Sequence, residues 1–221
     1  RIVARTLAGI QIKRRFGNLE ISEQLPASYV LWTMLGAAAL LGAWFGAAVP
    51  ASMGLQALML LHGEPWGLIE PFLGRDVGFY VFWVPVLGSA ITFGLVVTFL
   101  LFSLASAGYT ATGALRLSRG RLMAQELARV HLGVLLGLFF VLLGTRLWLA
   151  RFLILMDGTS GVQGIFGFTD AQARLPGMQT LLVLCSAAGV TIAWAAWKNR
   201  GPLLVGSALT AVLAALVIGQ I

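Results

Sequence analysis

The sequence predicts an all-α integral membrane protein, a bundle of about five transmembrane helices. Its 221 residues are 59% hydrophobic and only 10% charged, whereas a soluble globular domain carries about 25% charged residues. The mean hydropathy is +0.91. A chain of this composition has too little polar surface to cover a water-exposed core, so the lipid bilayer is its expected solvent.

Five apolar runs approach or reach the roughly 20 residues that a helix needs to cross a bilayer. The expected helices are about 29–49, 84–107, 130–149, 175–197 and 203–219, the last of them marginal in length. They define a transmembrane helical domain at 29–221, after a basic cytoplasmic segment at 1–28. The sequence begins without Met and ends inside an apolar run, so we expect it to be part of a longer protein.

A shorter apolar run lies between the first two of these helices. Met53–Leu61 is too short to span the bilayer. We expect it to form a short helix along the membrane interface, within the first outer loop, because an apolar helix of this length is stable there. An ordinary loop is the alternative.

The basic residues predict the orientation of the helices. Most of the 15 Lys and Arg residues precede the first helix or lie in the loops after the second and fourth helices. Because cytoplasmic loops are enriched in Lys and Arg, the N-terminal segment is expected in the cytoplasm and the C-terminus outside. This topology also explains the net charge of +7, so we expect no nucleic-acid partner.

Three motifs resemble one known family. The first outer loop, His62–Pro85, reads HGEPWGLIEPFLGRDVGFYVFWVP; Ala128–Leu132 reads ARVHL; and Phe168–Pro176 reads FTDAQARLP. In this order they are similar to the loop N-G-x-P-F-G-x-x-D-P-x-F-G-R-D-I-x-F-Y-x-F-x-L-P, to A-R-x-H-L and to Y-T-D-x-x-A-R-L-P of the bacterial membrane proteins catalogued only as Uncharacterised Protein Family 0182.

The resemblance implies a bacterial inner-membrane protein with about seven helices followed by a large extracytoplasmic domain, of which this chain would be the later helices. The chain departs from the family pattern at three positions, where His62 replaces Asn, Glu70 replaces Asp and Phe168 replaces Tyr. The spacing between Gly161 and Phe168 is also altered. The family has no established activity, so the resemblance implies no catalytic residue.

Charged residues gather in the two outer loops. The adjacent Arg75 and Asp76 suggest either a site for an ion or lipid headgroup, or a loop held in shape by bonds to its own backbone, which we favour. Asp170 and Arg174 have the spacing of a helical ion pair. If the loops converge, we expect a structural polar cluster, a gate or a docking surface, formed by Arg75, Asp76, Asp157, Asp170 and Arg174.

Small residues recur at the four-residue spacing that lets helices approach closely, although so many glycines and alanines also produce this spacing by chance. The candidate packing positions are Ala38, Gly42, Gly46, Gly133, Gly137, Gly189 and Ala193. His131 lies near the start of a helix. We interpret it as a structural, hydrogen-bonded histidine, and rank a ligand to haem iron or chlorophyll magnesium behind that interpretation. No other cofactor and no metal site is expected.

The function that these observations favour is a non-catalytic membrane subunit. It would contact membrane lipids and pack against the transmembrane polypeptides of a larger complex, for example a photosynthetic or respiratory one, although the sequence does not single out a host. The sequence shows no P-loop, H-E-x-x-H or G-x-S-x-G motif, and no acid or Lys at a helix centre, so we expect no enzyme. Two alternatives remain open: a fragment of a transporter or channel, and the membrane anchor of a cell-envelope enzyme whose outer domain is absent.

Overall fold

The computed structural model describes residues 11–16, 19–24, 27–47, 52–118, 121–157 and 166–200, together with Gly206 and Leu209. The chain divides into two compact units. The first unit comprises Arg1–Val49 and Leu100–Leu132, and the second unit comprises Pro50–Phe99 and Gly133–Ile221.

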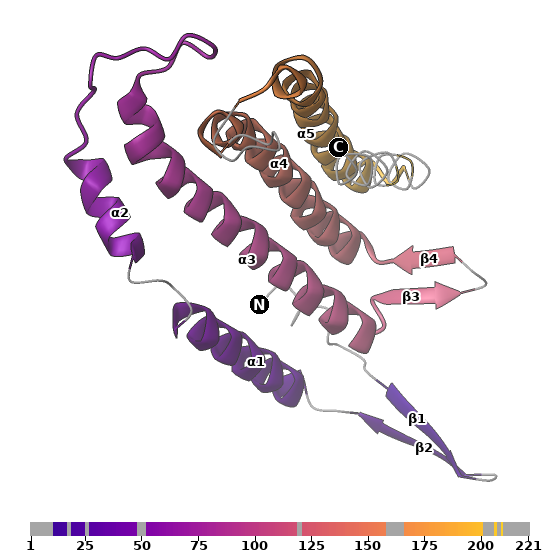
Figure 1. Cartoon of the computed structure of the whole chain (residues 1–221). Coiled ribbons are helices and arrows are strands. Elements are labelled where there is room, and N and C mark those ends of the chain that lie inside the picture. The colour runs from indigo at the N-terminus through magenta and orange to yellow at the C-terminus, as the bar shows by residue number, and fades with distance from the viewer. Residues whose placement is uncertain are drawn as a thin grey trace. The chain divides into compact units, whose positions relative to one another are not determined.

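Within the described residues the chain is helical, with two short antiparallel hairpins (Figure 1). The helices are α1 (Ala27–Ala47), α2 (Ser52–Leu61), α3 (Val84–Ala111), α4 (Glu126–Asp157) and α5 (Leu175–Trp197). Two π-helical turns, η2 (Phe79–Trp83) and η3 (Asp170–Arg174), lead directly into α3 and α5. This confirms the predicted all-α class.

Three helical stretches are long and apolar enough to cross a membrane: Phe79–Ala111, Glu126–Met156 and Asp170–Trp197. They confirm the second, third and fourth predicted helices and extend each of them. The third and fourth helices extend because helical hydrogen bonding continues past charged side chains, and long Arg side chains can lay their apolar stems along a helix. The second helix instead gains the apolar turn η2 at its start.

The remaining predicted helices have different outcomes. α1 is a 21-residue helix, in which the described apolar stretch is the shorter Leu31–Trp44. The predicted short helix is confirmed as α2, whose ten residues extend only about 15 Å. Of the predicted helix 203–219, the structure describes only Gly206 and Leu209, so that prediction falls outside the described residues.

Two hairpins occupy basic segments that the sequence analysis left without secondary structure. β1 (Gln11–Phe16) pairs with β2 (Leu19–Gln24), and β3 (Leu115–Ser118) pairs with β4 (Arg121–Ala124). Both are antiparallel. Antiparallel pairing satisfies backbone N–H and C=O groups without an apolar core, so hydropathy gave little signal for these strands.

The core of the first unit lies where the end of α3 meets the start of α4. Tyr109 and Ala128 are fully buried there. The Tyr109 hydroxyl lies 2.9 Å from Nδ1 of His131, and the two rings meet edge to face. The Gln125 N–H donates to the Ala114 carbonyl at 2.9 Å, closing the connection that carries β3 and β4.

In the second unit, α3 and α4 are antiparallel and meet through aromatic rings. Phe79 and Tyr80 of η2 lie edge to face on Phe152 of α4, with ring centroids 5.1 Å and 5.9 Å apart. Trp148 adds a further contact to the Phe152 ring at 5.0 Å. Such ring pairs are attractive beyond their buried area, so this cluster fixes the start of α3 against the end of α4.

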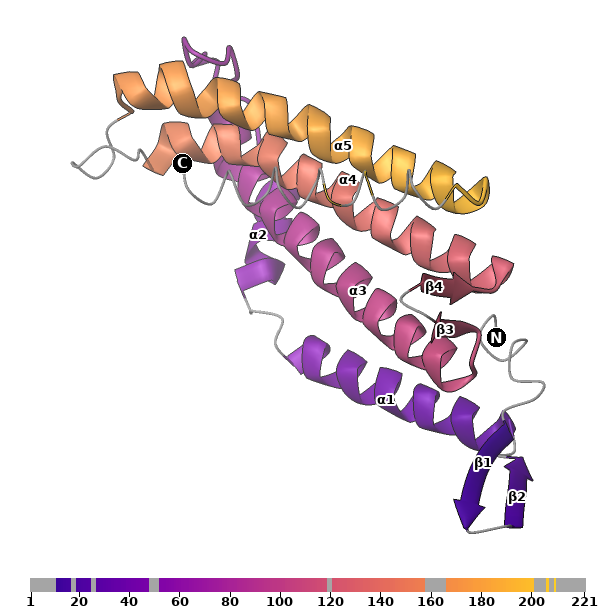
Figure 2. The same ribbon diagram turned by 90° about the vertical axis from the view of Figure 1, so that its right-hand side faces the viewer.

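α4 and α5 run side by side in two views (Figures 1 and 2), and glycines allow their close approach. A Cβ atom at Gly137 would lie 2.6 Å from the carbonyl oxygen of Gly189, and one at Gly189 would lie 2.6 Å from the carbonyl oxygen of Gly137. A Cβ atom at Gly144 would likewise lie 2.6 Å from the Ser186 hydroxyl. Small residues therefore bring the two backbones into direct contact.

The substitution Gly137→Ala is expected to destabilise the second unit by about 1–3 kcal/mol, because the new methyl group would collide with a backbone carbonyl that cannot rotate away. Unfolding of the purified protein by titration with a denaturing detergent would measure this change. Gly177→Ala is the matched control, since Gly177 lies on α5 with no described atom within 4 Å of its Cβ position. Equal stability of the two variants would contradict the close contact.

Candidate functional site

The candidate site is the loop between α2 and η2, residues His62–Gly78, here called the α2–α3 loop. Its path reverses at Gly67 and Gly74, whose φ angles of 73° and 65° favour glycine. Three backbone bonds tie the loop together: Glu70 N–H to the Arg75 carbonyl, Gly74 N–H to the Glu70 carbonyl, and Val77 N–H to the Leu68 carbonyl, at 2.9–3.0 Å. The loop therefore has a defined fold of its own.

Asp76 holds one side of this loop by accepting three backbone hydrogen bonds. Its Oδ2 accepts from the Gly67 N–H at 2.7 Å, and its Oδ1 accepts from the N–H groups of Gly78 at 2.7 Å and Trp66 at 3.0 Å. These donors favour the ionised carboxylate. The Trp66 N–H above all, then those of Gly78 and Gly67, hold the pKa of Asp76 below its usual value, against an opposing effect of partial desolvation.

Glu70 holds the other side of the loop in the same manner. Its carboxylate accepts from the N–H groups of Phe72 at 2.5 Å and Leu73 at 2.7 Å, and from the Tyr80 hydroxyl at 3.2 Å. Because Tyr80 is buried at the start of the membrane-spanning helix, Glu70 joins the loop to the helix. Sequence analysis did not select Glu70 as a site residue, although it occupies the acidic position of the loop motif, just before Pro71.

Arg75 contributes to the loop in a different way from its neighbour. Its side chain is exposed, and its guanidinium carbon lies 5.5 Å from the centroid of the Phe79 ring. A cation over an aromatic face is held electrostatically while it stays hydrated. Arg75 thus contacts an aromatic ring, whereas Asp76 forms the bonds to the loop backbone that the sequence analysis favoured for this pair.

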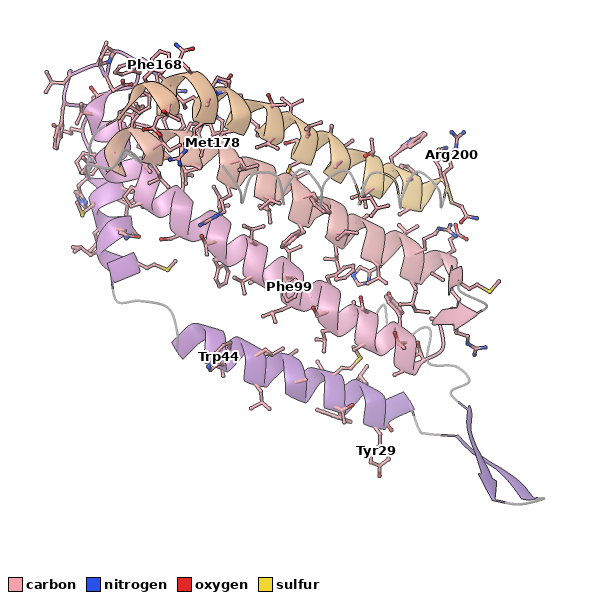
Figure 3. All side chains as sticks on the ribbon, turned by 45° about the vertical axis from the view of Figure 1, so that its right-hand side comes forward. Tyr29, Trp44, Phe99, Phe168, Met178 and Arg200 are labelled. Atoms are coloured by element: carbon pink, nitrogen blue, oxygen red, sulfur yellow. The ribbon has the colours of Figure 1, made fainter. Side chains whose placement is uncertain are left out.

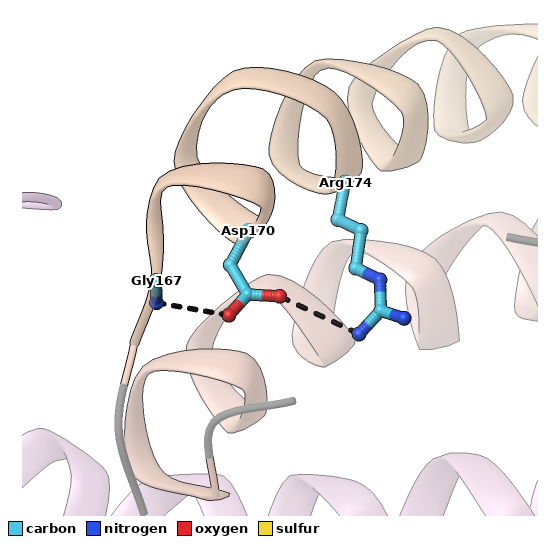
Figure 4. A network of polar contacts seen from close by, with 3 residues as sticks. All are labelled: Gly167, Asp170 and Arg174. Carbon is cyan, nitrogen blue, oxygen red and sulfur yellow. Dashed lines mark hydrogen bonds and ion pairs between the residues drawn. The ribbon is translucent and has the colours of Figure 1, made fainter. Parts of the chain in front are cut away.

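Asp170 and Arg174 form a local network at the start of α5 (Figure 4). Asp170 is only 2% exposed. Its Oδ2 accepts from the Gly167 N–H at 3.0 Å, and its Oδ1 lies 3.4 Å from Nη1 of Arg174, one helical turn away. A carboxylate at a helix N-terminus is favoured by the helix dipole, so the pair fixes the entry of the chain into η3 and α5.

The predicted polar cluster is thus divided between two networks. Asp76 has its partners within the α2–α3 loop and Arg75 lies over Phe79 of η2, whereas Asp170 pairs with Arg174. The two segments meet through apolar rings instead, with the centroids of Phe72 and Phe166 4.9 Å apart. Asp157 is the last residue of α4, and its side chain lies outside what the structure describes.

The other predicted residues lie elsewhere. Gly133, Gly137, Gly189 and Ala193 are at the contact between α4 and α5, since Cβ atoms at Gly133 and Gly137 would meet Ala196 and Ala193. In α1, Ala38, Gly42 and Gly46 are exposed, and no described atom lies within 4 Å of a Cβ atom at either glycine. His131 directs its Nδ1 to Tyr109, as given above.

The α2–α3 loop also displays apolar side chains, which sequence analysis did not select. Trp66, Leu68, Ile69 and Phe72, here called the apolar loop surface, are between 53% and 72% exposed. Phe168, which marks the loop end of α5 in Figure 3, with Arg200 past the opposite end, is 82% exposed. A group of exposed apolar side chains on an ordered loop is typical of an interaction surface.

Asp76 is poorly suited to act as a general base near neutral pH. A general base works best with a pKa near the operating pH, whereas the backbone donors hold the pKa of Asp76 below its usual value. Among the residues that the structure describes, no group of three or more His, Cys, Asp or Glu side chains could hold a metal ion.

Comparison with known proteins confirms the resemblance. The profile of the Uncharacterised protein family (UPF0182) matches residues 4–221. A UPF0182 protein of Leifsonia xyli subsp. xyli is 31% identical over 180 residues, which are 80% of this chain and 18% of that protein. A UPF0182 protein of Geobacter sulfurreducens is 30% identical over 142 residues, which are 64% of this chain and 16% of that protein.

A UPF0182 protein of Mycobacterium tuberculosis is 29% identical over 168 residues, which are 75% of this chain and 17% of that protein. The chain therefore spans less than a fifth of the length of these curated relatives. No solved structure matches the chain.

The substitution Asp76→Asn is expected to loosen the α2–α3 loop, because an amide keeps only one acceptor oxygen for three N–H donors. Cleavage by chymotrypsin at Trp66 or Phe72 should accelerate by about threefold to tenfold, since local opening exposes the backbone. Glu64→Gln is the matched control, because it makes the same chemical change at an exposed position of the same loop. Equal cleavage rates in the two variants would show that Asp76 does not order the loop.

Proposed function

The chain belongs to the Uncharacterised protein family UPF0182, and we propose that it is a non-catalytic integral membrane subunit that packs against other polypeptides of a larger complex. The observation that carries this proposal is the apolar loop surface, an exposed apolar group held on a loop whose own polar groups are internally bonded. The proposal also rests on the family, on the membrane-spanning helices and on the hydrogen bonds that Asp76 and Glu70 make within the loop.

A docking surface benefits from being ordered before its partner arrives, because a preformed surface loses little conformational entropy on binding. The carboxylates of Asp76 and Glu70 order the backbone on both sides of Leu68 and Ile69. The loop can therefore display these apolar side chains without collapsing onto them. This arrangement favours recognition of a polypeptide over chemistry at the carboxylates.

The Trp66 ring gives the surface a fixed edge. It meets the Phe82 ring edge to face, with centroids 6.2 Å apart. Gly63 lies beneath this pair, because a Cβ atom there would be 2.7 Å from the Phe82 ring. Aromatic side chains held in this way are frequent anchors of protein interfaces. The packed Trp66 ring therefore supports an interface in which the loop binds its partner without changing conformation.

The proposed location is the bacterial inner membrane, with the N-terminal segment in the cytoplasm and the α2–α3 loop on the outer side. The support for this orientation is the enrichment of Lys and Arg in alternate loops. Membrane lipids would then contact the exposed apolar faces of the helices. The partner polypeptide would bind the α2–α3 loop outside the hydrocarbon core.

The test is extraction of the native membrane with a mild detergent, followed by mass spectrometry of the polypeptides that co-purify at fixed stoichiometry. The double substitution Leu68→Ser with Ile69→Ser is expected to reduce the amount of co-purified partner by at least about fivefold, because exposed apolar anchors contribute most to such interfaces. Glu64→Gln, which changes the same loop without changing its apolar surface, should leave the yield unchanged. A chain that purifies alone, or a double variant that keeps its partner, would refute the subunit role.

A further inference from the structure

The C-terminal end of α5 is closed by a defined backbone motif. Asn199 has a φ angle of 57°, a left-handed conformation that Asn adopts more readily than most residues. Around it, the Arg200 N–H donates to the Ala195 carbonyl at 3.0 Å, after the Lys198 N–H has donated to the Trp194 carbonyl at 2.9 Å. A bond that returns around a left-handed residue in this way is typical of the Schellman motif. Backbone bonds therefore fix the direction in which the chain leaves α5.

This cap turns two cations back onto the last tryptophans of the helix. The guanidinium carbon of Arg200, labelled in Figure 3, lies 5.4 Å from the centroid of the Trp194 ring, and Nζ of Lys198 lies 5.9 Å from the centroid of the Trp197 ring. The two tryptophans are 43% and 69% exposed. A cation is attracted to the face of an indole ring, so the end of α5 holds two positive charges on two exposed rings.

These cations keep their hydrogen-bond donors for another group. A contact with a ring face uses their charge, and among the described residues neither cation forms an ion pair or donates a side-chain hydrogen bond. The acids of the second unit whose side chains are described lie at the other end of its helices. Asp170 begins the 28-residue helical stretch that Trp197 ends, about 40 Å away, and Glu64, Glu70 and Asp76 belong to the α2–α3 loop. An anion that meets the two cations must therefore come from elsewhere.

An exposed apolar face of α5 leads up to the cations. Val183, Ala187, Val190, Trp194 and Trp197 are all exposed, and they follow one another at intervals of four and three residues, which places them on one face of the helix. Both valines are 64% exposed. These five residues, here called the apolar stripe, extend along the helix for about 20 Å, while the glycine face of α5 packs on α4.

A phospholipid matches both parts of this surface. Trp side chains favour the headgroup level of a membrane, so the cations that directly follow Trp194 and Trp197 lie at the level of the lipid phosphates. A free phosphate would use the cations and leave the apolar stripe exposed to water. A phospholipid with a net negative charge places its phosphate on the cations and an acyl chain along the stripe, and basic residues near a membrane surface attract such lipids.

We infer that the C-terminal end of α5 is a binding site for an anionic phospholipid. Lys198 and Arg200 bind its phosphate, the Trp194 ring positions Arg200, and the apolar stripe receives an acyl chain. In the orientation proposed above, this lipid belongs to the cytoplasmic leaflet. The site goes beyond the proposed subunit role and does not depend on it, because it uses the opposite end of α5 from the one near the α2–α3 loop.

The experiment uses the purified full-length protein in phosphatidylcholine nanodiscs that contain a small fraction of photo-reactive phosphatidylglycerol, with a diazirine in its acyl chain. Mass spectrometry of the peptides after illumination should locate the label between Val183 and Trp197. Phosphatidylcholine with the same reactive acyl chain should label this segment at least about tenfold less, because its headgroup has no net charge for the two cations to attract. An excess of glycerol 3-phosphate, which has the phosphate without the acyl chains, should leave the labelling by phosphatidylglycerol unchanged.

Three variants separate a built site from general attraction to positive charge. Lys198→Gln with Arg200→Gln should lower the labelling by phosphatidylglycerol to that by phosphatidylcholine. Trp194→Leu keeps every charge and should lower it by at least about threefold, because Arg200 loses the ring that positions it. Arg151→Gln is the matched control, since it removes a guanidinium that lies over aromatic rings near the other end of α4, and it should leave the labelling of α5 unchanged. If a variant does not fold, the preference of the unmodified protein between the two lipid probes still decides.

Equal labelling of α5 by the two lipid probes, or labelling that survives the loss of both cations, would overturn the inference. Labelling that Trp194→Leu leaves unchanged would show general charge attraction and overturn the built site, and displacement by glycerol 3-phosphate would assign the cations to a soluble phosphate. In the native membrane, a photo-reactive benzoyl-phenylalanine at Val190 should cross-link to lipid, whereas a cross-link to a polypeptide would assign the apolar stripe to a protein partner and overturn the lipid site.

Discussion

An irregular loop at the end of a membrane helix has to satisfy its backbone N–H groups without the regular bonds of a helix or sheet. In this chain two carboxylates meet that requirement. Asp76 accepts three backbone N–H groups, and Glu70 accepts two more together with the Tyr80 hydroxyl. The order of the loop, and the display of its apolar side chains, depends on these bonds.

The same network connects the loop to the helices of the second unit. The Tyr80 hydroxyl donates a hydrogen bond to Glu70 of the loop, and the Tyr80 ring packs on Phe152, so the loop and α4 share one buried ring. α4 then meets α5 through backbones that touch at Gly137 and Gly189. Polar bonds at the loop and small residues between helices thus contribute to one continuous packing arrangement.

Hydropathy and spacing predicted the long helices and placed Gly137 and Gly189 on packing faces, because both depend on local periodicity. The two hairpins were missed because their strands fall in basic segments and are held by backbone hydrogen bonds, which hydropathy does not register. Glu70 was missed for a related reason: its partners are backbone amides and Tyr80, ten residues away, and no side-chain pattern encodes such partners. The bond from Arg146 to Thr92 depends on how α3 packs against α4, which one helix alone does not reveal.

The most direct test of this account is the hydrogen exchange of the Trp66, Gly67 and Gly78 amides as a function of pH, divided by the intrinsic exchange rate at each pH. The folded loop lowers the pKa of Asp76 from its usual value of 3.8. Its stabilising effect should therefore be complete above pH 3.8 and should disappear as the pH falls through the lowered pKa. Strong protection that is lost only below pH 3.8 is the predicted result, whereas amides that exchange as fast as an unfolded chain at neutral pH, or protection that persists unchanged at the lowest pH, would contradict it.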